Sequence, residues 1–151
     1  KPVPMQHGKP VNANFVYSVH VRPLAYDPRR MLIVGIDQGL FAAAAALQRN
    51  SLGQIRTLAE CVNLAEDRKT LRKLGGAAFG KSLKQMITTN FPDVAPDMIR
   101  FVADPAAFAA KDREDDEQDW LLACQKALGV KIYKAKSNKA ALRNEAIWQA
   151  Q

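Results

Sequence analysis

The chain has 151 residues, 48% of them hydrophobic and 25% charged, which is the composition of one folded domain with a buried core. Its apolar runs fall short of the roughly 20 residues that cross a bilayer, so we expect no membrane partner. Lys and Arg total 22 against 15 Asp and Glu, and the net charge of +7 favours a polyanionic partner, although a solvated basic surface has the same charge.

The first part of the chain predicts an irregular lead-in followed by three strands. Residues 1–30 are rich in proline and lack periodicity, so we expect a linker there. Residues 31–36 are a short apolar run that ends at Asp37, which is the pattern of a buried strand. Residues 40–48 predict a second strand, although their alanines suit a helix equally well, and residues 54–62 alternate as a third.

The second part of the chain predicts helices that alternate with strands. A helix is expected over residues 76–89, and an apolar strand over residues 98–103 ends at Asp104. The remaining predicted elements are a helix over 114–128, a strand over 130–133 and a helix over 138–149. The resulting order is β-β-β-α-β-α-β-α in one domain, residues 31–151.

This order of elements predicts an α/β domain of the ribonuclease H-like fold, with a mixed five-stranded sheet in the order 3-2-1-4-5 flanked by helices. In that sheet Asp37 and Asp104 end neighbouring parallel strands, about 4.8 Å apart. Two such carboxylates repel each other unless a cation lies between them, and oxygen ligands select Mg²⁺ or Mn²⁺. Two such ions, about 3.5–4 Å apart, promote phosphodiester hydrolysis. The alternative is that each aspartate merely ends its strand.

Glu60 is a third candidate for the site. It closes the predicted third strand, which would run parallel to the first but two places away, roughly 9.6 Å off. At that distance we expect Glu60 to position DNA rather than to bind metal directly. A glutamate that simply faces solvent at a strand end explains the residue equally well.

The basic residues gather in two groups, one around residues 68–84 and the other around residues 126–143. The side chains that we expect to contact DNA phosphates are Lys81, Lys84, Lys136, Lys139 and Arg143. An acidic run from Asp112 to Asp119 separates the groups and predicts a solvated loop followed by the first turn of a helix.

The cysteines and histidines indicate neither a disulfide nor a zinc site. Cys61 and Cys124 are far apart in apolar surroundings, so we expect two reduced, buried thiols, as in a reducing compartment. His7 and His20 lie far apart and have no cysteine near them, so zinc is not expected.

Motifs along most of the chain resemble one known family. Residues 33–48, Ile-Val-Gly-Ile-Asp-Gln-Gly-Leu-Phe-Ala-Ala-Ala-Ala-Ala-Leu-Gln, precede a glycine turn at Gly53 and a strand that carries Glu60. The other matching segments are Gly8-Lys9-Pro10-Val11, His20, Phe91-Pro92, Asp104-Pro105-Ala106, Gly129-Val130, Ala135, Ser137-Asn138 and Arg143. The ordered set resembles the nuclease domain of the tailed-bacteriophage terminase large subunit.

That resemblance implies a DNA endonuclease dependent on Mg²⁺ or Mn²⁺, with Asp37 and Asp104 as metal ligands. It implies cleavage of concatemeric viral DNA during genome packaging, in the host cell cytoplasm. The implied partners are double-stranded DNA, a terminase motor domain, the small terminase subunit and the procapsid portal.

The family also has a third carboxylate, well after the arginine that Arg143 resembles. The chain starts at Lys1 rather than Met and ends at Gln151, so we expect a piece of a longer protein, truncated at its C-terminus. Glu145 comes too early, while Asp115, Asp116 and Asp119 remain possible substitutes. We therefore expect the 151 residues to hold metal weakly and to cut DNA poorly until the extension is restored.

Three alternatives remain open. Residues 75–82, Gly-Gly-Ala-Ala-Phe-Gly-Lys-Ser, match the phosphate-loop pattern G-x-x-x-x-G-K-S of ATP-binding domains, but residues 66–73 before them are charged and helix-like instead of a strand. Residues 35–39 resemble the first phosphate motif of actin-like ATPases. Those ATPases also need a second phosphate motif after a later strand, and residues 104–107 do not match it. An inactive fold that docks DNA or protein is the third, and the presence of both aspartates disfavours it.

Overall fold

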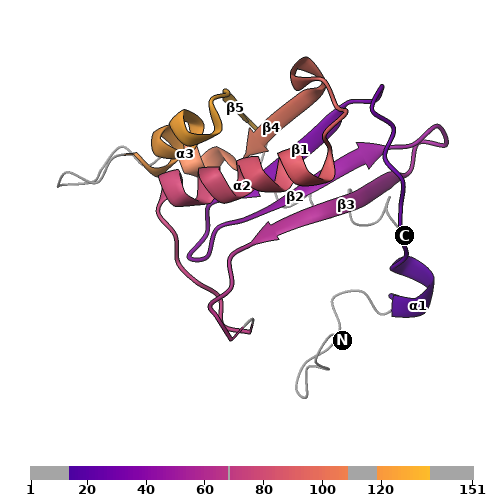
Figure 1. The fold of residues 1–151 in the computed structure, drawn as a ribbon, viewed down its shortest axis with the longest axis horizontal. Helices are drawn as coiled ribbons and strands as arrows, with labels where there is room; N and C mark the ends of the chain where they lie inside the picture. Colours follow the sequence, from indigo (N-terminus) through magenta and orange to yellow (C-terminus); the bar gives the residue numbers. More distant parts are fainter. Residues whose placement is uncertain (1–13, 68, 109–118, 137–151) are drawn as a thin grey trace.

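Five strands of the chain form one mixed sheet in the order β3-β2-β1-β4-β5 (Figure 1). The strands are β1 (Leu32–Asp37), β2 (Ala43–Arg49), β3 (Ile55–Val62), β4 (Ile99–Ala103) and β5 (Ile132–Lys134). The helices are α1 (Tyr17–His20), α2 (Gly76–Asn90) and α3 (Trp120–Leu128), with 3₁₀ turns η1 (Pro96–Met98) and η2 (Pro105–Phe108). This computed structural model describes residues 14–67, 69–108 and 119–136.

The predicted fold class and strand order are confirmed. β1 pairs antiparallel with β2 and parallel with β4, β2 pairs antiparallel with β3, and β4 pairs parallel with β5. The ambiguous alanine run is a strand, because alternate alanines such as Ala44 and Ala46 are buried while their neighbours are half-buried. Of the predicted helix over residues 114–128, the described part is α3, and the predicted helix over 138–149 lies outside the described residues.

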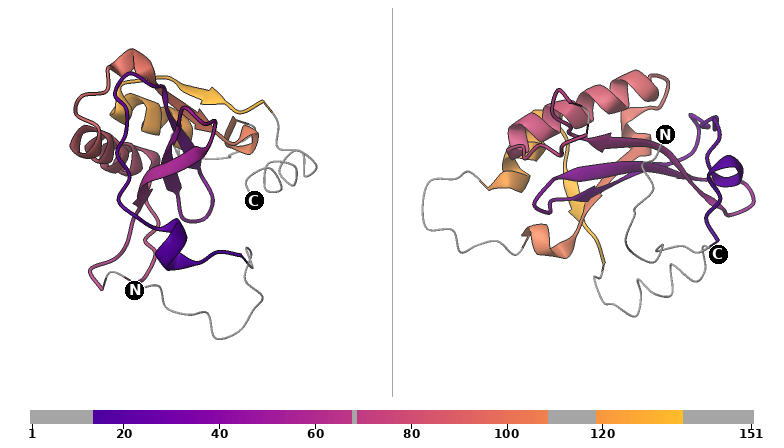
Figure 2. Two further views of the ribbon diagram at one scale, coloured as in Figure 1. Left: turned by 90° about the vertical axis from the view of Figure 1, so that its right-hand side faces the viewer. Right: turned by 90° about the horizontal axis from the view of Figure 1, so that it is seen from below.

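Helices α2 and α3 cover one face of the sheet (Figure 2). The alternation of β1 turns Leu32, Val34 and Ile36 into the core beneath these helices. The helices contribute Phe79 and Leu83, which are fully buried. Ile33 and Asp37, on the other face of β1, are exposed. Among the described helices, none is long and apolar enough to cross a membrane.

Two glycines let α2 and α3 lie unusually close together. A Cβ atom added at Gly76 would come within 1.9 Å of the Trp120 carbonyl oxygen, and one at Gly80 within 2.7 Å of the Cys124 carbonyl oxygen. Both neighbours are backbone atoms, which cannot move without displacing α3. The absence of side chains at these two positions therefore sets the distance between the helices.

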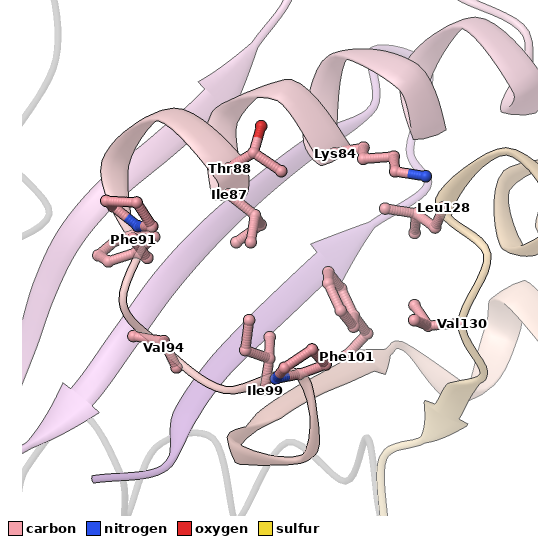
Figure 3. A pocket seen from close by; sticks show the side chains of 11 residues that line it. Lys84, Ile87, Thr88, Phe91, Val94, Ile99, Phe101, Leu128 and Val130 are labelled. Atoms are coloured by element: carbon pink, nitrogen blue, oxygen red, sulfur yellow. The ribbon is translucent and has the colours of Figure 1, made fainter. Parts of the chain in front are cut away.

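An apolar pocket of about 430 Å³ opens at the far end of α2, beside the start of β4. Its walls include Ile87, Phe91, Phe101 and Val130, and Lys84 stands at one side (Figure 3). The pocket lies at the end of β4 where Ile99 begins the strand, so it is remote from Asp104, which follows the strand's last residue.

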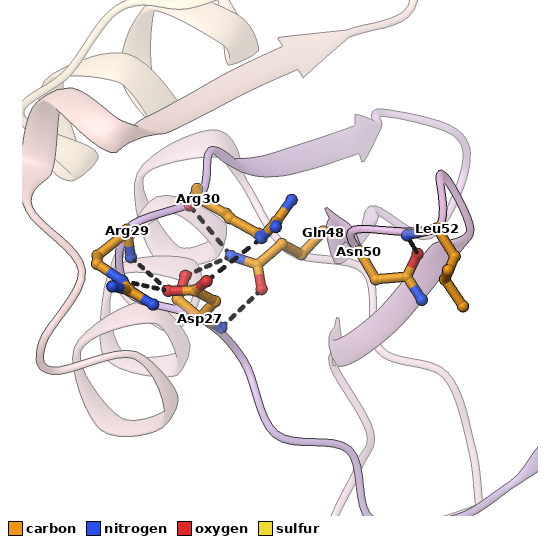
Figure 4. Close-up of polar contacts among 6 residues, drawn as sticks. All are labelled: Asp27, Arg29, Arg30, Gln48, Asn50 and Leu52. Atoms are coloured by element: carbon orange, nitrogen blue, oxygen red, sulfur yellow. Dashed lines mark hydrogen bonds and ion pairs between the residues drawn. The ribbon is translucent and has the colours of Figure 1, made fainter.

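The lead-in is tied to the sheet by Gln48, a buried polar side chain of β2 (Figure 4). Its amide nitrogen donates to the carbonyl oxygens of Asp27 and Arg30, at 2.8 and 3.1 Å, and its Oε1 accepts from the Asp27 N–H at 2.8 Å. Tyr26 packs edge-on against Phe91, with ring centroids 5.2 Å apart. The last residues of the predicted linker are therefore part of the folded domain.

β3 is an outer strand of the described sheet and contains a bulge. Ala46 pairs with Ala59 but Leu47 pairs with Thr57, so Leu58 is an extra residue in the ladder. Beyond the bulge, the residues that face the core shift by one position along the strand. Cys61 is therefore buried and Glu60 is exposed.

The segment after β3 corrects one prediction. Residues 66–73 were expected to be helix-like, but Leu64 and Leu71 form an antiparallel bridge, and Asp67 makes the turn between them. Its carboxylate accepts from the N–H groups of Lys69 and Thr70, both at 2.9 Å. Aspartate side chains compete in this way with the helical hydrogen bonds of the backbone.

The two cysteines are free and buried, as predicted. Burial, together with the neighbouring Cys61 thiol, raises the pKa of Cys124 to about 12 from an ordinary 9.0. The folded protein thus keeps this proton at a pH where the unfolded chain loses it.

We therefore expect the contribution of the protonated Cys124 thiol to stability to be fully present below pH 9.0 and to be lost as pH rises toward about 12. The loss from Cys124 should approach about 1.4 kcal/mol per pH unit. Urea unfolding at about pH 8 and about pH 10 measures it, and Cys124→Ala should show a shallower decline. Equal declines in the two proteins would contradict the prediction.

Candidate metal centre

Asp37 and Asp104 stand side by side at one edge of the sheet. The parallel register of β1 and β4 pairs Ile36 with Ala103, and the next residues in each strand direction are the two aspartates. Adjacent strands are about 4.8 Å apart, so the backbones of the two aspartates lie close together where β1 and β4 end. The alternation of β1 turns Asp37 away from the helix-covered face.

Each carboxylate is oriented by a local turn. Asp37 Oδ1 accepts from the Gly39 N–H at 3.0 Å, and Asp104 Oδ1 accepts from the Ala106 N–H at 2.7 Å. A Cβ at Gly39 would lie 3.4 Å from Asp37 Oδ1, so the glycine allows the backbone to approach the carboxylate closely. In both residues Oδ2 has no hydrogen-bond donor among the described residues. Each aspartate thus offers one oxygen to a ligand.

No described cation pairs with either carboxylate. The ion pairs in the described part of the chain join Asp27 to Arg29 and Arg30, before β1 begins. Asp37 is exposed and Asp104 is half-buried, so both are open to an ion from solvent. Two adjacent carboxylates without a counter-charge are a favourable environment for a divalent cation.

Glu60 lies further away than the carboxylate pair. It pairs with Ala45, which pairs with Gly35, so it lies two strands from β1 and two residues back from the Asp37 row. Those offsets separate Glu60 from Asp37 by about 12 Å. The strand continues to Val62, so Glu60 does not close it as predicted. The distance suits contact with a bound polymer better than contact with a shared ion.

The described residues add no third carboxylate to the pair. Asp119 is the N-cap of α3, where its Oδ1 accepts from the N–H groups of Leu121 and Leu122 at 3.0 and 3.4 Å. Asp115, Asp116 and Glu145 lie outside the described residues. Within the ranges that the structure describes, no cluster of three or more His, Cys, Asp or Glu side chains could hold a metal ion.

The predicted DNA contacts separate into different locations. Lys136 follows β5 at the edge that carries the aspartates, where the Ala135 N–H donates to the Ala103 carbonyl oxygen at 2.9 Å. Lys81 and Lys84 are exposed on α2, which covers the other face. Lys139 and Arg143 lie outside the described residues.

A basic arm at the same edge lies outside the predicted DNA contacts, although its cations belong to the basic group around residues 68–84. We define it as residues 63–67 and 69–73, which follow the last residue of β3. Lys69, Arg72 and Lys73 are exposed on it. The sequence shows that these cations cluster, but only the strand register reveals which edge of the sheet they reach.

The phosphate-loop pattern does not form a phosphate loop. Gly75 is the N-cap of α2, and the residues from Gly76 onward are helical, so the pattern's second glycine, Gly80, lies within the helix. Gly76 and Gly80 are accounted for by the close contact with α3. Likewise, Asp104 opens the 3₁₀ turn η2 in place of the phosphate hairpin that an actin-like ATPase needs.

Lys81→Ala is accordingly expected to leave nucleotide binding unchanged, because the helical backbone presents no ring of N–H groups to a phosphate. Calorimetry with ATP and Mg²⁺ on the wild type and the variant measures this. Micromolar binding in the wild type that disappears in Lys81→Ala would restore the ATP-binding interpretation.

No family model and no curated protein matches the chain. Among solved structures, its fold is similar to that of the large terminase from a thermophilic bacteriophage, with a TM-score of 0.51. The match covers 87% of this chain at 16% sequence identity, and the chain spans 30% of the length of that terminase. Similarity at this level of identity concerns the fold, a mixed five-stranded sheet in the order 3-2-1-4-5 flanked by helices.

Proposed function

We propose that this chain is the nuclease part of a phage large terminase, cutting double-stranded DNA with Mg²⁺ or Mn²⁺. The observation that supports it most is the adjacency of Asp37 and Asp104 at the ends of two parallel strands, in a fold like that of a large terminase. Neither carboxylate has a described ion-pair partner. Cleavage of concatemeric DNA during genome packaging is the role that this proposal includes.

The donors fit a hard divalent ion. Oxygen atoms from Asp37 and Asp104 would hold it, and the Gly39 and Ala106 N–H groups orient the two carboxylates beforehand. When bound, such an ion would supply a more acidic water and would neutralise charge on the scissile phosphate. Two carboxylates would leave the other positions around the ion to water.

The remaining residues in this proposal act on the DNA. Lys136, beside the aspartates, neutralises a phosphate near the cut, and Glu60 stands about 12 Å off along the same open face. Lys81 and Lys84 are on the covered side and are left out of the proposed interface. A motor domain, a small subunit and a portal are the partners expected for a terminase.

A plasmid-nicking assay tests the proposal. The chain is incubated with supercoiled DNA in millimolar Mn²⁺ or Mg²⁺, with Ca²⁺ and with chelator alone. Because two carboxylates hold metal weakly, we expect slow nicking, in Mn²⁺ and Mg²⁺ only, with little dependence on DNA sequence. Calorimetric titration with Mn²⁺ in the absence of DNA provides a second readout. No Mn²⁺ binding together with no cleavage would overturn the proposal, while Mn²⁺ binding without cleavage would favour a docking module.

A further inference from the structure

The basic arm begins beside the candidate metal centre. The register aligns Asp37 with Ala43 and Ala43 with Val62, so the arm leaves the sheet in the Asp37 row, two strands away. That separation is roughly 9.6 Å. It is comparable with the width of about 12 Å of the DNA major groove, across which the two backbones face each other.

The arm is held at its base and at its tip. At the base, the Arg72 N–H donates to the Asn63 carbonyl oxygen at 2.8 Å, and the Trp120 indole N–H donates to the Leu74 carbonyl oxygen at 3.1 Å. Near the tip, the Ala65 N–H donates to the Thr70 carbonyl oxygen at 2.8 Å. The arm is thus a folded hairpin, which presents its side chains at defined positions.

The described residues of the arm carry a net positive charge, with Lys69, Arg72 and Lys73 against Glu66 and Asp67. Asp67 stays ionised in the turn, because the Thr70 hydroxyl and the N–H groups of Thr70 and Lys69 donate to its carboxylate and keep its pKa below the ordinary value. Lys69, Arg72 and Lys73 are exposed and form no ion pair with a described acid. Glu66 is also exposed, so the arm carries a mixed but net basic surface.

We propose that the basic arm binds the sugar-phosphate backbone of the duplex whose other strand lies at Asp37 and Asp104. Lys69, Arg72 and Lys73 each neutralise one phosphate, and the arm that carries them leaves the sheet about one groove width from Asp37. This inference rests on the proposed function for the location of the cut. The arm's contact with DNA is measurable whether or not the chain cleaves.

The experiment compares three proteins, each as the full chain. One variant removes the arm's cations (Lys69→Ala, Arg72→Ala, Lys73→Ala), and a control removes three exposed cations elsewhere (Arg22→Ala, Arg29→Ala, Lys126→Ala). Both lose the same charge, so a difference between them reports position. Binding to a linear duplex is measured in Ca²⁺ by fluorescence anisotropy between about 50 and about 200 mM salt.

We expect the arm variant to bind about tenfold more weakly at low salt, with the slope of log K against log salt smaller by about 2.7, or about 0.9 for each phosphate contact. The control should keep the wild-type slope. Equal losses in both variants, or an arm variant that binds like the wild type, would overturn the inference.

Two further readouts separate this inference from the proposed function. If the wild type cleaves, the arm variant should keep its Mn²⁺ affinity and its rate at saturating DNA while KM rises. The wild type could instead neither bind Mn²⁺ nor cleave DNA. A selective loss of DNA affinity in the arm variant would then still support DNA binding by the arm, and only the nuclease proposal would fail.

Discussion

Asp37→Asn and Asp104→Asn are each expected to lower Mn²⁺-dependent cleavage by a factor of about 100 or more, which corresponds to about 2.7 kcal/mol of activation free energy. Asparagine has nearly the shape of aspartate, and its amide oxygen can still accept the N–H of Gly39 or Ala106. The variants therefore keep the turns and lose only the charge that holds the ion.

Two matched substitutions show whether the effect is specific. Glu60→Gln removes a carboxylate on the open face two strands away, and should reduce cleavage much less. Asp27→Asn removes a carboxylate that precedes β1, at the opposite edge of the sheet from Asp37. It should leave the rate of DNA cleavage unchanged. Initial rates of plasmid nicking and Mn²⁺ titrations are compared at equal protein concentration. If both asparagine variants at positions 37 and 104 cut as fast as the wild type, the centre is elsewhere.

Gly76→Ala should cause the largest loss of stability of any single methyl group added to α2. The new Cβ would lie 1.9 Å from the Trp120 carbonyl oxygen and 2.8 Å from its carbon, and α3 would have to move away. Forced displacement in a packed core costs about 3 kcal/mol at the upper end of the usual range. Urea unfolding followed by circular dichroism measures the change in the free energy of unfolding.

Gly80→Ala offers a graded comparison. Its Cβ would lie 2.7 Å from the Cys124 carbonyl oxygen, a smaller overlap, and alanine recovers about 1 kcal/mol of helix propensity. The net loss should therefore be smaller than at Gly76. Gly35→Ala is the control, because no described atom lies within 4 Å of the added Cβ, and it should be neutral or slightly stabilising. A Gly76→Ala protein as stable as the wild type would contradict the close packing of α2 and α3.

The sheet could be predicted from the sequence because each strand is a short apolar or alternating run next to a turn. Residues 31–36 and 98–103 were each expected within one residue of β1 and β4, and this placed Asp37 and Asp104 at strand ends. The order of elements then predicted that β1 and β4 are neighbours, because a strand that returns by a helical crossover lies parallel to its neighbour. The aspartate pair could thus be predicted by combining the local strand patterns with the topological rule for crossovers.

Other features depend on contacts between distant segments, and no local pattern carries them. The clamp of Gln48 on Asp27 and Arg30 joins residues about 20 positions apart, so the end of the lead-in looked like a linker. The glycines of α2 matched a phosphate loop, because the pattern cannot tell a glycine needed for a turn from one needed for helix contact. The arm appeared helix-like, because charge spacing does not reveal the turn at Asp67.

The bulge at Leu58 has a consequence for the behaviour of the protein at high concentration. An outer strand offers unpaired N–H and C=O groups to any other chain, and a long flat strand of this kind is a template for aggregation. The extra residue interrupts the regular spacing of those groups, and charged Arg56 and Glu60 stand on either side of it. A foreign strand could follow only a few residues of β3 before losing register, so the irregular ladder disfavours the addition of another chain at this strand.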